Sequence, residues 1–532
     1  MHSPLDIETG LLQGIPGRDR SVTVYRGIPY AAPPTGDLRW RAPGPAEPWT
    51  GVRDAAHFGP MCPQSPQDRV AAGIDLPLSE DCLSLNVWTA ARDESERLPV
   101  LVWIYGGLFR AGTGANPRYD GERLAGKGVV VVTFNYRLGV FGFLSTPELS
   151  AESGHEASGN YGLLDCIAVL GWVQRNIAAF GGDPSRVTVA GQSAGAGTVN
   201  FLSMSPLARG LFHRSIVQSH ARYSADPELR YLSTSYRALA DAEQAGERYV
   251  REHGGGGLRR LRKLPWQKLV DGHAAVDDAV DSLSVAKPPL FRPVVDGYVI
   301  PHGYAETYAL GEQNDVFYIA GNNLDESGAV PDAAFAEYRR AGAGTFRPGA
   351  PPVYVTRADF VAAAERRFGP MTEEFFRLYP ADDEDQAARS AAAAARDNAR
   401  VSTYLWGAEW TRHATKPLYT YLWAYPAPPL NGAGGTRRAG HGSEIEFVFG
   451  NLDPDDPRWS YEDRRVSETM TSYWANFIAT GNPNGPGLPD WPPYVPGSGT
   501  VMRFGEKFAP EPVAEAARFE FWQRFFATQK PW

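Results

Sequence analysis

Short runs of consecutive apolar residues are the clearest pattern in this chain. Four of them, at residues 100–105, 129–134, 187–190 and 316–320, are rich in β-branched or aromatic side chains. A fifth run, at residues 418–425, is mostly aromatic and aliphatic. Strands that are apolar without alternation are typical of a mostly parallel sheet covered by helices on both faces. These runs therefore predict the central strands of such a sheet.

Longer segments with helical spacing separate the predicted strands. Residues 163–180 repeat apolar positions at helical intervals, and residues 385–414 include an alanine run that favours a helix. Strands and helices that alternate along the whole chain predict an α/β fold with one large, doubly wound sheet. Because the glycine-rich stretches at 341–352 and 431–440 read as loops within this alternation, we expect a single domain over residues 1–532.

The N-terminal part of the chain has a different pattern. Residues 27–40 are dense in proline, glycine and aromatic residues, which form turns and short strands instead of helices. Residues 80–88 alternate apolar and polar side chains, which predicts a strand with one buried and one exposed face. We therefore expect a small β region at the N-terminal side of the main sheet.

One predicted strand leads directly into a serine flanked by glycines. Residues 191–195 read Gly-Gln-Ser-Ala-Gly, after the strand at 187–190 and before a segment that can form a helix. A strand that turns into a helix within one residue holds that residue at a strained backbone angle and leaves its neighbours no room for side chains. The Ser193 hydroxyl would then stand near the positive end of a helix. This setting predicts that Ser193 is a nucleophile.

A serine needs partners before it can act as a nucleophile, because a base must remove its proton and a carboxylate must orient that base. In α/β hydrolases both partners follow the serine in the chain, each from a loop at the carboxyl end of a strand. Asp325 and Glu326 come just after the strand at 316–320, and His441 follows the strand at 418–425 and a glycine-rich loop. We expect His441 to be the base; by position alone, either carboxylate could orient it.

The composition narrows the possible partners and location. A formal charge of −9 and the absence of a basic stripe argue against a nucleic-acid surface. No run approaches the roughly 18 consecutive apolar residues of a membrane span, so no membrane contact is expected. The first residues have neither a basic nor an apolar segment of the kind found in signal peptides, and a cytoplasmic location is expected.

Eight ordered motifs extend over nearly the whole chain. They lie at residues 27–31 (Gly-Ile-Pro-Tyr-Ala), 80–86 (Glu-Asp-Cys-Leu-Ser-Leu-Asn), 160–165 (Asn-Tyr-Gly-Leu-Leu-Asp), 180–184 (Phe-Gly-Gly-Asp-Pro), 191–196 (Gly-Gln-Ser-Ala-Gly-Ala), 291–297 (Phe-Arg-Pro-Val-Val-Asp-Gly), 442–447 (Gly-Ser-Glu-Ile-Glu-Phe) and 473–477 (Tyr-Trp-Ala-Asn-Phe). Together they resemble the type-B carboxylesterases, the family of the cholinesterases and the bacterial para-nitrobenzyl esterases. The resemblance implies a single-domain α/β-hydrolase fold, no cofactor, and a triad of Ser193, Glu326 and His441. It thus places the triad carboxylate on Glu326 and not on Asp325.

The resemblance also implies an oxyanion hole, the set of N–H groups that stabilises the tetrahedral intermediate. Its donors fall on the backbone of Gly107, Leu108 and Ala194. Relatives carry glycine where this chain has Leu108, so a leucine side chain must fit in a tight loop close to the substrate. We expect a narrowed acyl pocket or a misdirected donor at this position. The neighbouring Phe109 is a candidate substrate contact.

Other positions are assigned by the same resemblance. Gln192 stands where choline-binding relatives carry glutamate, and His220 replaces a glycine of the family. Both are candidate substrate contacts. Ser219 and Glu444 match a buried polar network behind the triad in relatives.

The three cysteines allow two interpretations. Without an export signal and without C-x-x-C spacing, they read by default as free thiols, and no metal site is expected. The resemblance, in contrast, matches Cys62 and Cys82 to the N-terminal disulfide of the family. Cys166 lies in the helix predicted at 163–180, where we expect a buried, inert thiol.

Three functions are compatible with these observations. The first is a serine esterase that acts on uncharged carboxylic esters of modest size through an acyl-enzyme on Ser193. The second, suggested by Leu108 and His220, is a specialised deacylase, lactone-forming or acyl-transfer enzyme of secondary metabolism. The third, an inactive binding protein on the same scaffold, is disfavoured by the complete triad. A small-molecule ester is the expected partner, and the oligomeric state is left open.

Overall fold

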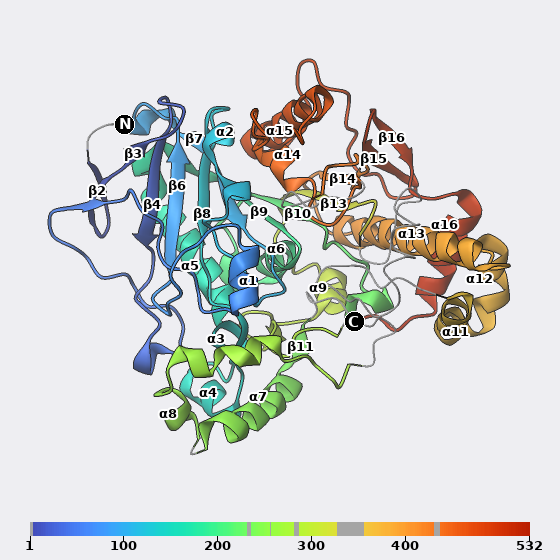
Figure 1. Ribbon diagram of the computed structural model, residues 1–532, viewed down its shortest axis with the longest axis horizontal. Helices are drawn as coiled ribbons and strands as arrows, with labels where there is room; N and C mark the ends of the chain where they lie inside the picture. The colour runs from blue at the N-terminus through green and yellow to red at the C-terminus, as the bar shows by residue number, and fades with distance from the viewer. Residues whose placement is uncertain (1–3, 231–235, 256, 281–286, 327–355, 430–436) are drawn as a thin grey trace.

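The computed structural model describes residues 4–230, 236–255, 257–280, 287–326, 356–429 and 437–532 (Figure 1). Within these residues, eleven strands form one large sheet. In spatial order they are β16 (Phe508–Pro512), β15 (Thr500–Phe504), β14 (Leu418–Trp423), β13 (Phe317–Asn323), β10 (Arg214–Gln218), β9 (Gly182–Gln192), β7 (Leu98–Ile104), β8 (Val130–Phe134), β6 (Ser84–Thr89), β4 (Thr23–Pro29) and β3 (Ile15–Pro16). Strands β15 through β8 pair in parallel, and the pairs at both ends of the sheet are antiparallel.

The apolar runs of the sequence form the middle of this sheet. They correspond to β7, β8, β9, β13 and β14, although β9 is much longer than the predicted strand. Every residue of β8 and of β10 is buried, so both faces of the sheet are covered. The predicted α/β fold with a central, mostly parallel sheet is therefore confirmed.

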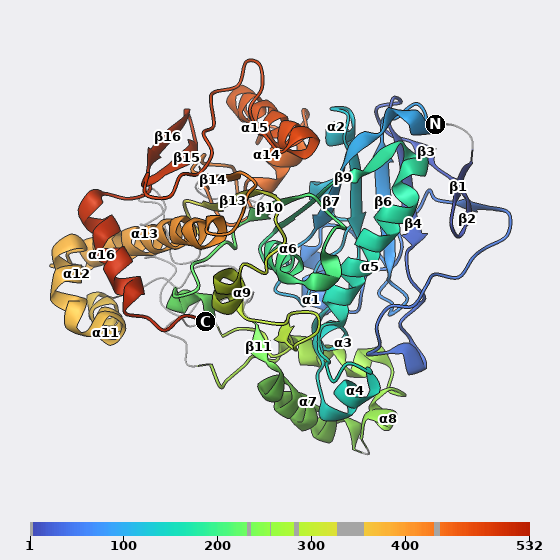
Figure 2. The ribbon, with the colours of Figure 1, turned by 180° about the vertical axis from the view of Figure 1, so that it is seen from behind.

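Helices cover the sheet and link its strands. The predicted helices at 163–180 and 385–414 are α5 (Tyr161–Asn176) and α13 (Glu384–Thr411), and α6 (Ala194–Met204) and α15 (Tyr461–Thr480) also contact central strands. Figure 2 shows α5 and α6 on the face turned to the viewer. The other α-helices of the described residues are α1 (Pro66–Ala71), α2 (Glu122–Ala125), α3 (Gly139–Phe143), α4 (Pro147–Glu152), α7 (Leu239–Gly254), α8 (Leu258–Leu261), α9 (Tyr304–Leu310), α11 (Arg357–Phe368), α12 (Thr372–Leu378), α14 (Ile445–Phe449) and α16 (Ala516–Ala527).

One helical segment is unusually apolar. Helix α5 continues as a 3-10 turn, and the combined segment Tyr161–Phe180 is, among the described helices, the one long and apolar enough to cross a membrane. More than half of its apolar window is buried inside the protein, and α5 packs against β9 and α6. These contacts are those of a core helix in an α/β fold.

The N-terminal β region is present, with one correction. A three-stranded sheet joins β1 (Leu5–Ile7), β2 (Gly10–Gln13) and β5 (Val52–Asp54), and β11 (Arg237–Ala238) pairs with β12 (Val294–Val295) elsewhere. The alternating strand predicted at 80–88 is β6, but the expected exposed face was wrong, since all of β6 except its first residue is buried. Its polar positions bond internally: Asn86 Nδ2 donates to Thr133 Oγ1 at 3.0 Å, across to β8.

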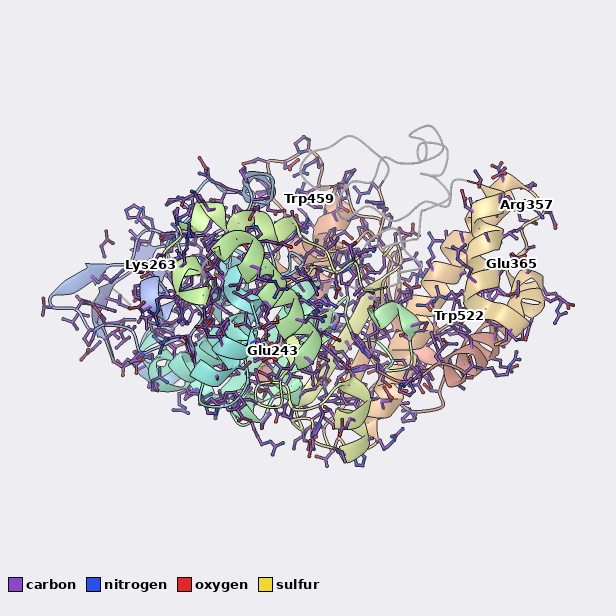
Figure 3. All side chains as sticks on the ribbon, turned by 90° about the horizontal axis from the view of Figure 1, so that it is seen from below. Glu243, Lys263, Arg357, Glu365, Trp459 and Trp522 are labelled. Atoms are coloured by element: carbon purple, nitrogen blue, oxygen red, sulfur yellow. A yellow bond between two sulfur atoms is a disulfide. The ribbon has the colours of Figure 1, made fainter. Side chains whose placement is uncertain are left out.

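A second hydrophobic cluster lies at the β16 end of the sheet, where α11, α12, α13 and α16 meet. Phe368 of α11 stacks on Phe375 of α12 with ring centroids 4.2 Å apart. Trp522 of α16 donates its indole N–H to the Tyr379 hydroxyl at 2.9 Å. In Figure 3, Trp522 marks this end of the molecule and Lys263 the other. The glycine-rich stretch predicted at 341–352 lies outside the described residues, as do residues 431–436 of the second one.

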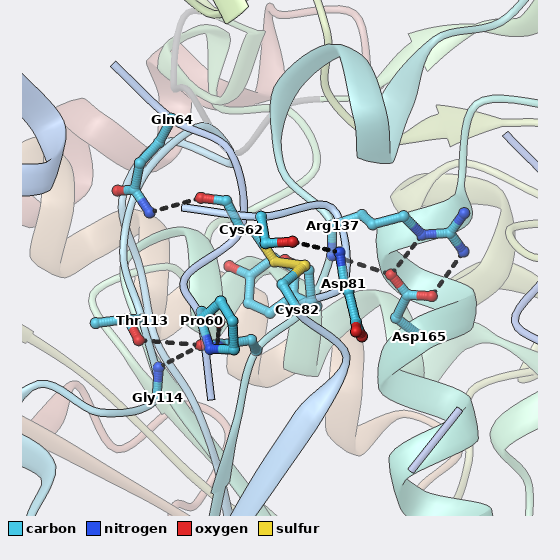
Figure 4. Close-up of a disulfide and its surroundings, with 12 residues drawn as sticks. Pro60, Cys62, Gln64, Asp81, Cys82, Thr113, Gly114, Arg137 and Asp165 are labelled. Atoms are coloured by element: carbon cyan, nitrogen blue, oxygen red, sulfur yellow. Dashed lines mark hydrogen bonds and ion pairs between the residues drawn. A yellow bond between two sulfur atoms is a disulfide. The ribbon is translucent and has the colours of Figure 1, made fainter. Parts of the chain in front are cut away.

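Cys62 and Cys82 form a disulfide (Figure 4). The structure therefore follows the pairing that the family resemblance implied, and the free-thiol expectation was wrong for these two residues. In a chain-entropy model, closing a loop of 20 residues stabilises the fold by about 3 kcal/mol. Cys166 is free and buried, and burial raises the pKa of its thiol, so the group stays neutral as expected.

An ion pair beside the disulfide ties α5 to the end of β8 (Figure 4). The Arg137 side chain is 3% exposed and that of Asp165 is fully buried. Arg137 Nε and Nη2 donate to the two carboxylate oxygens at 2.8 and 2.7 Å, and the Arg137 backbone N–H donates to one of them at 3.0 Å. With its hydrogen bonds made, neither charge is left unpaired in the interior.

Asp165→Ala would leave the Arg137 guanidinium buried without its counter-charge. We expect it to lower the free energy of unfolding by about 3–5 kcal/mol. The control is Glu373→Ala, which removes the exposed partner of Arg377 on α12 and should leave stability nearly unchanged. Urea denaturation followed by tryptophan fluorescence measures both, and equal midpoints for the two variants would contradict the expectation.

Candidate active site

Ser193 lies between β9, which ends at Gln192, and α6, which begins at Ala194. Both elements are labelled in Figure 1. Ser193 has a φ of 58° and a ψ of −125°, which fall in a region that residues other than glycine rarely adopt. The flanking glycines allow this turn because it packs against β7: a Cβ on Gly195 would overlap the carbonyl oxygen of Ile104, and one on Gly191 would lie 2.8 Å from it. The sharp strand-to-helix turn predicted from the motif is present.

Glu326 and His441 meet beyond the carboxyl ends of β13 and β14. His441 Nδ1 lies 2.7 Å from Glu326 Oε2, and Glu326 Oε1 accepts the backbone N–H of Asn323 at 3.0 Å. The Glu326 carboxylate is buried, whereas 36% of the His441 side chain is exposed. The imidazole is therefore held by a carboxylate on one nitrogen and is still reachable from outside.

Asp325, the neighbouring carboxylate, is used elsewhere. Its Oδ1 accepts from Arg396 Nη2 at 2.7 Å, and its Oδ2 accepts the backbone N–H of Ala439 at 3.0 Å. Asp325 thus holds the backbone just before His441, while Glu326 contacts the ring itself. The geometry separates two residues that position in the sequence alone could not distinguish.

Opposing effects set the pKa values of this pair. Burial lowers the pKa of His441, but the charge and hydrogen bond of Glu326 and the charge of Glu444 outweigh it, so the pKa is raised above its ordinary value. Burial raises the pKa of Glu326, yet the charge and hydrogen bond of His441 and the hydroxyl of Ser219 bring it below its ordinary value. The pair therefore combines an ionised carboxylate with an imidazole that is a stronger base than usual.

A buried polar network that includes Glu444 lies behind the pair. Glu444 is completely buried and accepts hydrogen bonds from Gln218 Nε2 at 2.9 Å and from Asn323 Nδ2. Burial raises its pKa, because the charged form loses its solvation. Ser219 has a φ of 66° at the end of β10 and donates its N–H to Gly321 at 2.8 Å. Sequence reasoning missed Gln218 and Asn323, although both are polar residues at the carboxyl ends of predicted or neighbouring strands.

The loop after β7 lies against the serine turn. A Cβ on Gly106 would be 2.8 Å from Ser193 Cβ and 3.3 Å from the Ala194 nitrogen. Among the described hydrogen bonds, none is donated by the backbone N–H of Gly107 or Leu108. Ala194 opens α6, and N–H groups in a first helical turn have no acceptor within the helix. No described hydrogen bond therefore uses these three N–H groups, and the loop that carries two of them starts at Gly106, next to Ser193.

The side chains of this loop go in different directions. Leu108 has a φ of 59°, is half-buried and belongs to neither hydrophobic cluster of the described residues. Phe109 has a φ of 58° but is completely buried, with its ring edge-on to Phe143 at 5.3 Å. The expectation that Phe109 contacts substrate was wrong, because two successive left-handed residues turn its side chain into the core.

Gln192 and His220 take up buried positions. Gln192 Nε2 lies 3.1 Å from His441 Nε2, so this side chain contacts the candidate base directly. His220 Nε2 pairs with the Tyr304 hydroxyl at 3.0 Å, and burial together with the charge of Arg222 lowers its pKa to about 3. The His220 ring is therefore neutral at physiological pH, and a role in substrate binding stays a prediction.

These groups together suit acyl transfer, which needs a nucleophile, a base with an orienting acid and a set of oxyanion donors. No described hydrogen bond joins the Ser193 hydroxyl to His441; such contacts are often long before a substrate binds.

A metal would need several ligating side chains in one place, and the described residues contain no cluster of three or more His, Cys, Asp or Glu that could hold one.

The chain is similar to known ester hydrolases over almost its full length. The model of the carboxylesterase family matches residues 2–522. Fumonisin B1 esterase of Sphingopyxis macrogoltabida is 36% identical over 511 residues, which cover 94% of this chain and 86% of that protein. Phenmedipham hydrolase of Pseudarthrobacter oxydans (91% and 92% covered) and para-nitrobenzyl esterase of Bacillus subtilis (93% and 93% covered) are each 34% identical. Because both the family model and these relatives span almost its full length, this chain belongs to the carboxylesterase family and is a serine hydrolase of carboxylic esters.

Proposed function

We propose that this enzyme hydrolyses small, uncharged carboxylic esters through an acyl-enzyme on Ser193. The observation that carries the proposal is the pairing of His441 with Glu326 at 2.7 Å, beside a serine turn with unused N–H donors. The relatives are named for three different substrates, fumonisin B1, phenmedipham and a para-nitrobenzyl ester. They support ester hydrolysis as a class and leave the natural substrate to experiment.

Acylation uses the three residues in turn. Ser193 Oγ attacks the ester carbonyl carbon while His441 Nε2 accepts the serine proton. The negative oxygen that forms is stabilised by the N–H groups of Gly107, Leu108 and Ala194, and one such donor contributes about 2.7–4 kcal/mol in comparable enzymes. The imidazolium, stabilised by the Glu326 carboxylate, then gives its proton to the leaving alcohol as the carbon–oxygen bond breaks.

Deacylation repeats these steps with water. His441 accepts a proton from the water molecule as its oxygen attacks the acyl carbon, and the same N–H groups hold the second tetrahedral oxygen. Ser193 Oγ leaves and takes the proton back from His441, which releases the carboxylic acid. No step requires a cofactor.

An acyl-transfer enzyme is the second candidate, in which an alcohol or an internal hydroxyl replaces water. Leu108 favours it, because a leucine side chain of the oxyanion loop that faced the acyl carbon would leave less room for water there. Product analysis with an added alcohol separates the two reactions.

We also propose that all 532 residues act as one catalytic domain, since strands from Ile15 to Pro512 share a single sheet.

Ser193→Ala removes the nucleophile and should lower kcat/KM for para-nitrophenyl acetate by at least about 10³-fold. Wild-type enzyme should also react with a fluorophosphonate, with the added mass on the peptide that contains Ser193. Equal hydrolysis by both proteins would contradict the acyl-enzyme.

Glu326→Gln should lower kcat by roughly 10²–10⁴-fold, since the imidazolium loses its counter-charge. Because the Glu326 charge raises the pKa of His441, its loss should move the acid limb of the kcat/KM profile to lower pH. Asp325→Asn is the matched control and should keep the wild-type limb, as Asp325 contacts Arg396 and not the ring. A shift of the limb in Asp325→Asn alone would contradict this assignment and make Asp325 the carboxylate that orients His441.

Leu108→Gly should raise kcat/KM for para-nitrophenyl esters of longer acyl chains by roughly three- to tenfold, with less change for the acetate, because one to two methylene-sized contacts are relieved. Leu108→Ala distinguishes the effect of side-chain size from that of backbone strain. Alanine shortens the side chain to a methyl group but keeps the energetic cost of a positive φ. Unchanged acyl-chain preference in both variants would show that Leu108 does not border the acyl site.

A further inference from the structure

Gln192 touches His441 in a way that its position in the sequence does not reveal. Its side-chain nitrogen lies 3.1 Å from His441 Nε2 and 3.5 Å from His441 Nδ1. The lone pair of Nε2 lies in the plane of the ring and points away from Nδ1. A donor on that axis would be much closer to Nε2 than to Nδ1, so the similar distances place the amide over the face of the ring. Gln192 therefore leaves the in-plane side of Nε2 open.

The carboxamide lies next to the backbone of Gly442. Gln192 is 6% exposed, and a Cβ on Gly442 would be in van der Waals contact with three atoms of its amide group, at 3.4–3.5 Å. Gly442 has a φ of 73°, which favours glycine at this position. Arg118 Nη2 donates to the Gly442 carbonyl and, at 2.8 Å, to Glu446 Oε2, so the backbone beside the amide is itself anchored.

The charged groups that face His441 come from three elements. Glu326 follows β13 and Glu444 precedes α14, and both raise the pKa of the imidazole. Arg118, in the 3-10 turn Pro117–Tyr119, opposes them weakly. Gln192, at the end of β9, is the neutral neighbour. A third carboxylate at that position would stabilise the imidazolium further and leave less of the neutral base near pH 7.

We propose that Gln192 is a positioning residue, whose carboxamide holds the face of the His441 ring and keeps that side of the imidazole uncharged. The inference rests on the proposed ester hydrolysis and assigns Gln192 to the base, in place of the substrate contact expected from the sequence. It predicts two separable effects, one on the acidity of His441 and one on the orientation of its ring.

Gln192→Glu tests the first effect. For a neutral para-nitrophenyl ester, this substitution should move the acid limb of the kcat/KM profile to higher pH by about one unit. A shift of this size is expected for a carboxylate within contact distance of an imidazolium. At pH values well above that limb, the KM of the variant should stay within about twofold of wild type. Gln523→Glu, which adds the same charge at an exposed site on α16, is the control and should leave the limb unmoved.

Gln192→Met tests the second effect, because methionine has similar length without polar atoms. It should lower kcat about tenfold, with KM and the acid limb unchanged, as expected for an imidazole held less firmly. It also keeps the proposal testable if Gln192→Glu fails to fold, which its melting temperature will show.

Two results would overturn the proposal. One is a folded Gln192→Glu variant with an unmoved limb but an altered KM, which would make Gln192 a substrate contact. The other is a Gln192→Met variant with wild-type kcat. Failure of the proposed function itself is distinguishable, because wild-type enzyme would then show no activity that Ser193→Ala abolishes.

Discussion

The close packing of the serine turn against β7 is the constraint on which the site depends. Gly195 approaches the carbonyl of Ile104 so closely that no side chain could fit between them. This contact forces Ser193 into its strained conformation and brings the loop after β7 to the same place. The nucleophile and the candidate oxyanion donors are therefore positioned by one backbone approach. The parallel pairing of β7 with β9 supports it over six residue pairs, from Leu98 to Ile104.

The electrostatics of the site follow from burial. Two carboxylates, Glu326 and Glu444, lie in the interior within reach of one imidazole, and each has its oxygens occupied by hydrogen bonds. Without those donors, buried carboxylates would favour their protonated forms. The network thus keeps Glu326 ionised and His441 basic. The same argument explains why an uncharged Gln192 on the face of the ring suits a base that must lose its proton near neutral pH.

The oxyanion loop shows how backbone conformation decides the role of a side chain. Leu108 and Phe109 are adjacent, apolar and both left-handed, yet only Phe109 enters the core. An aromatic residue beside a substrate loop suggests a binding contact, and that reading failed because the turn directs the ring toward Phe143. The alternation that suggested an exposed face on β6 failed for a related reason, since Asn86 finds polar partners inside the protein.

Local pattern was sufficient for the α/β fold, the central strands, the long helices and the serine turn, because each depends on residues close together in the chain. Resemblance to the carboxylesterases added the choice of Glu326 and the Cys62–Cys82 pair, which no local rule supplies. Tertiary structure alone brought together residues that lie more than a hundred positions apart, such as Glu326 with His441 and Gln218 with Glu444. It also decided that Gln192 lies on the imidazole ring. Burial, hydrogen-bond partners and the direction of a side chain are properties of the packed chain, and a linear pattern does not contain them.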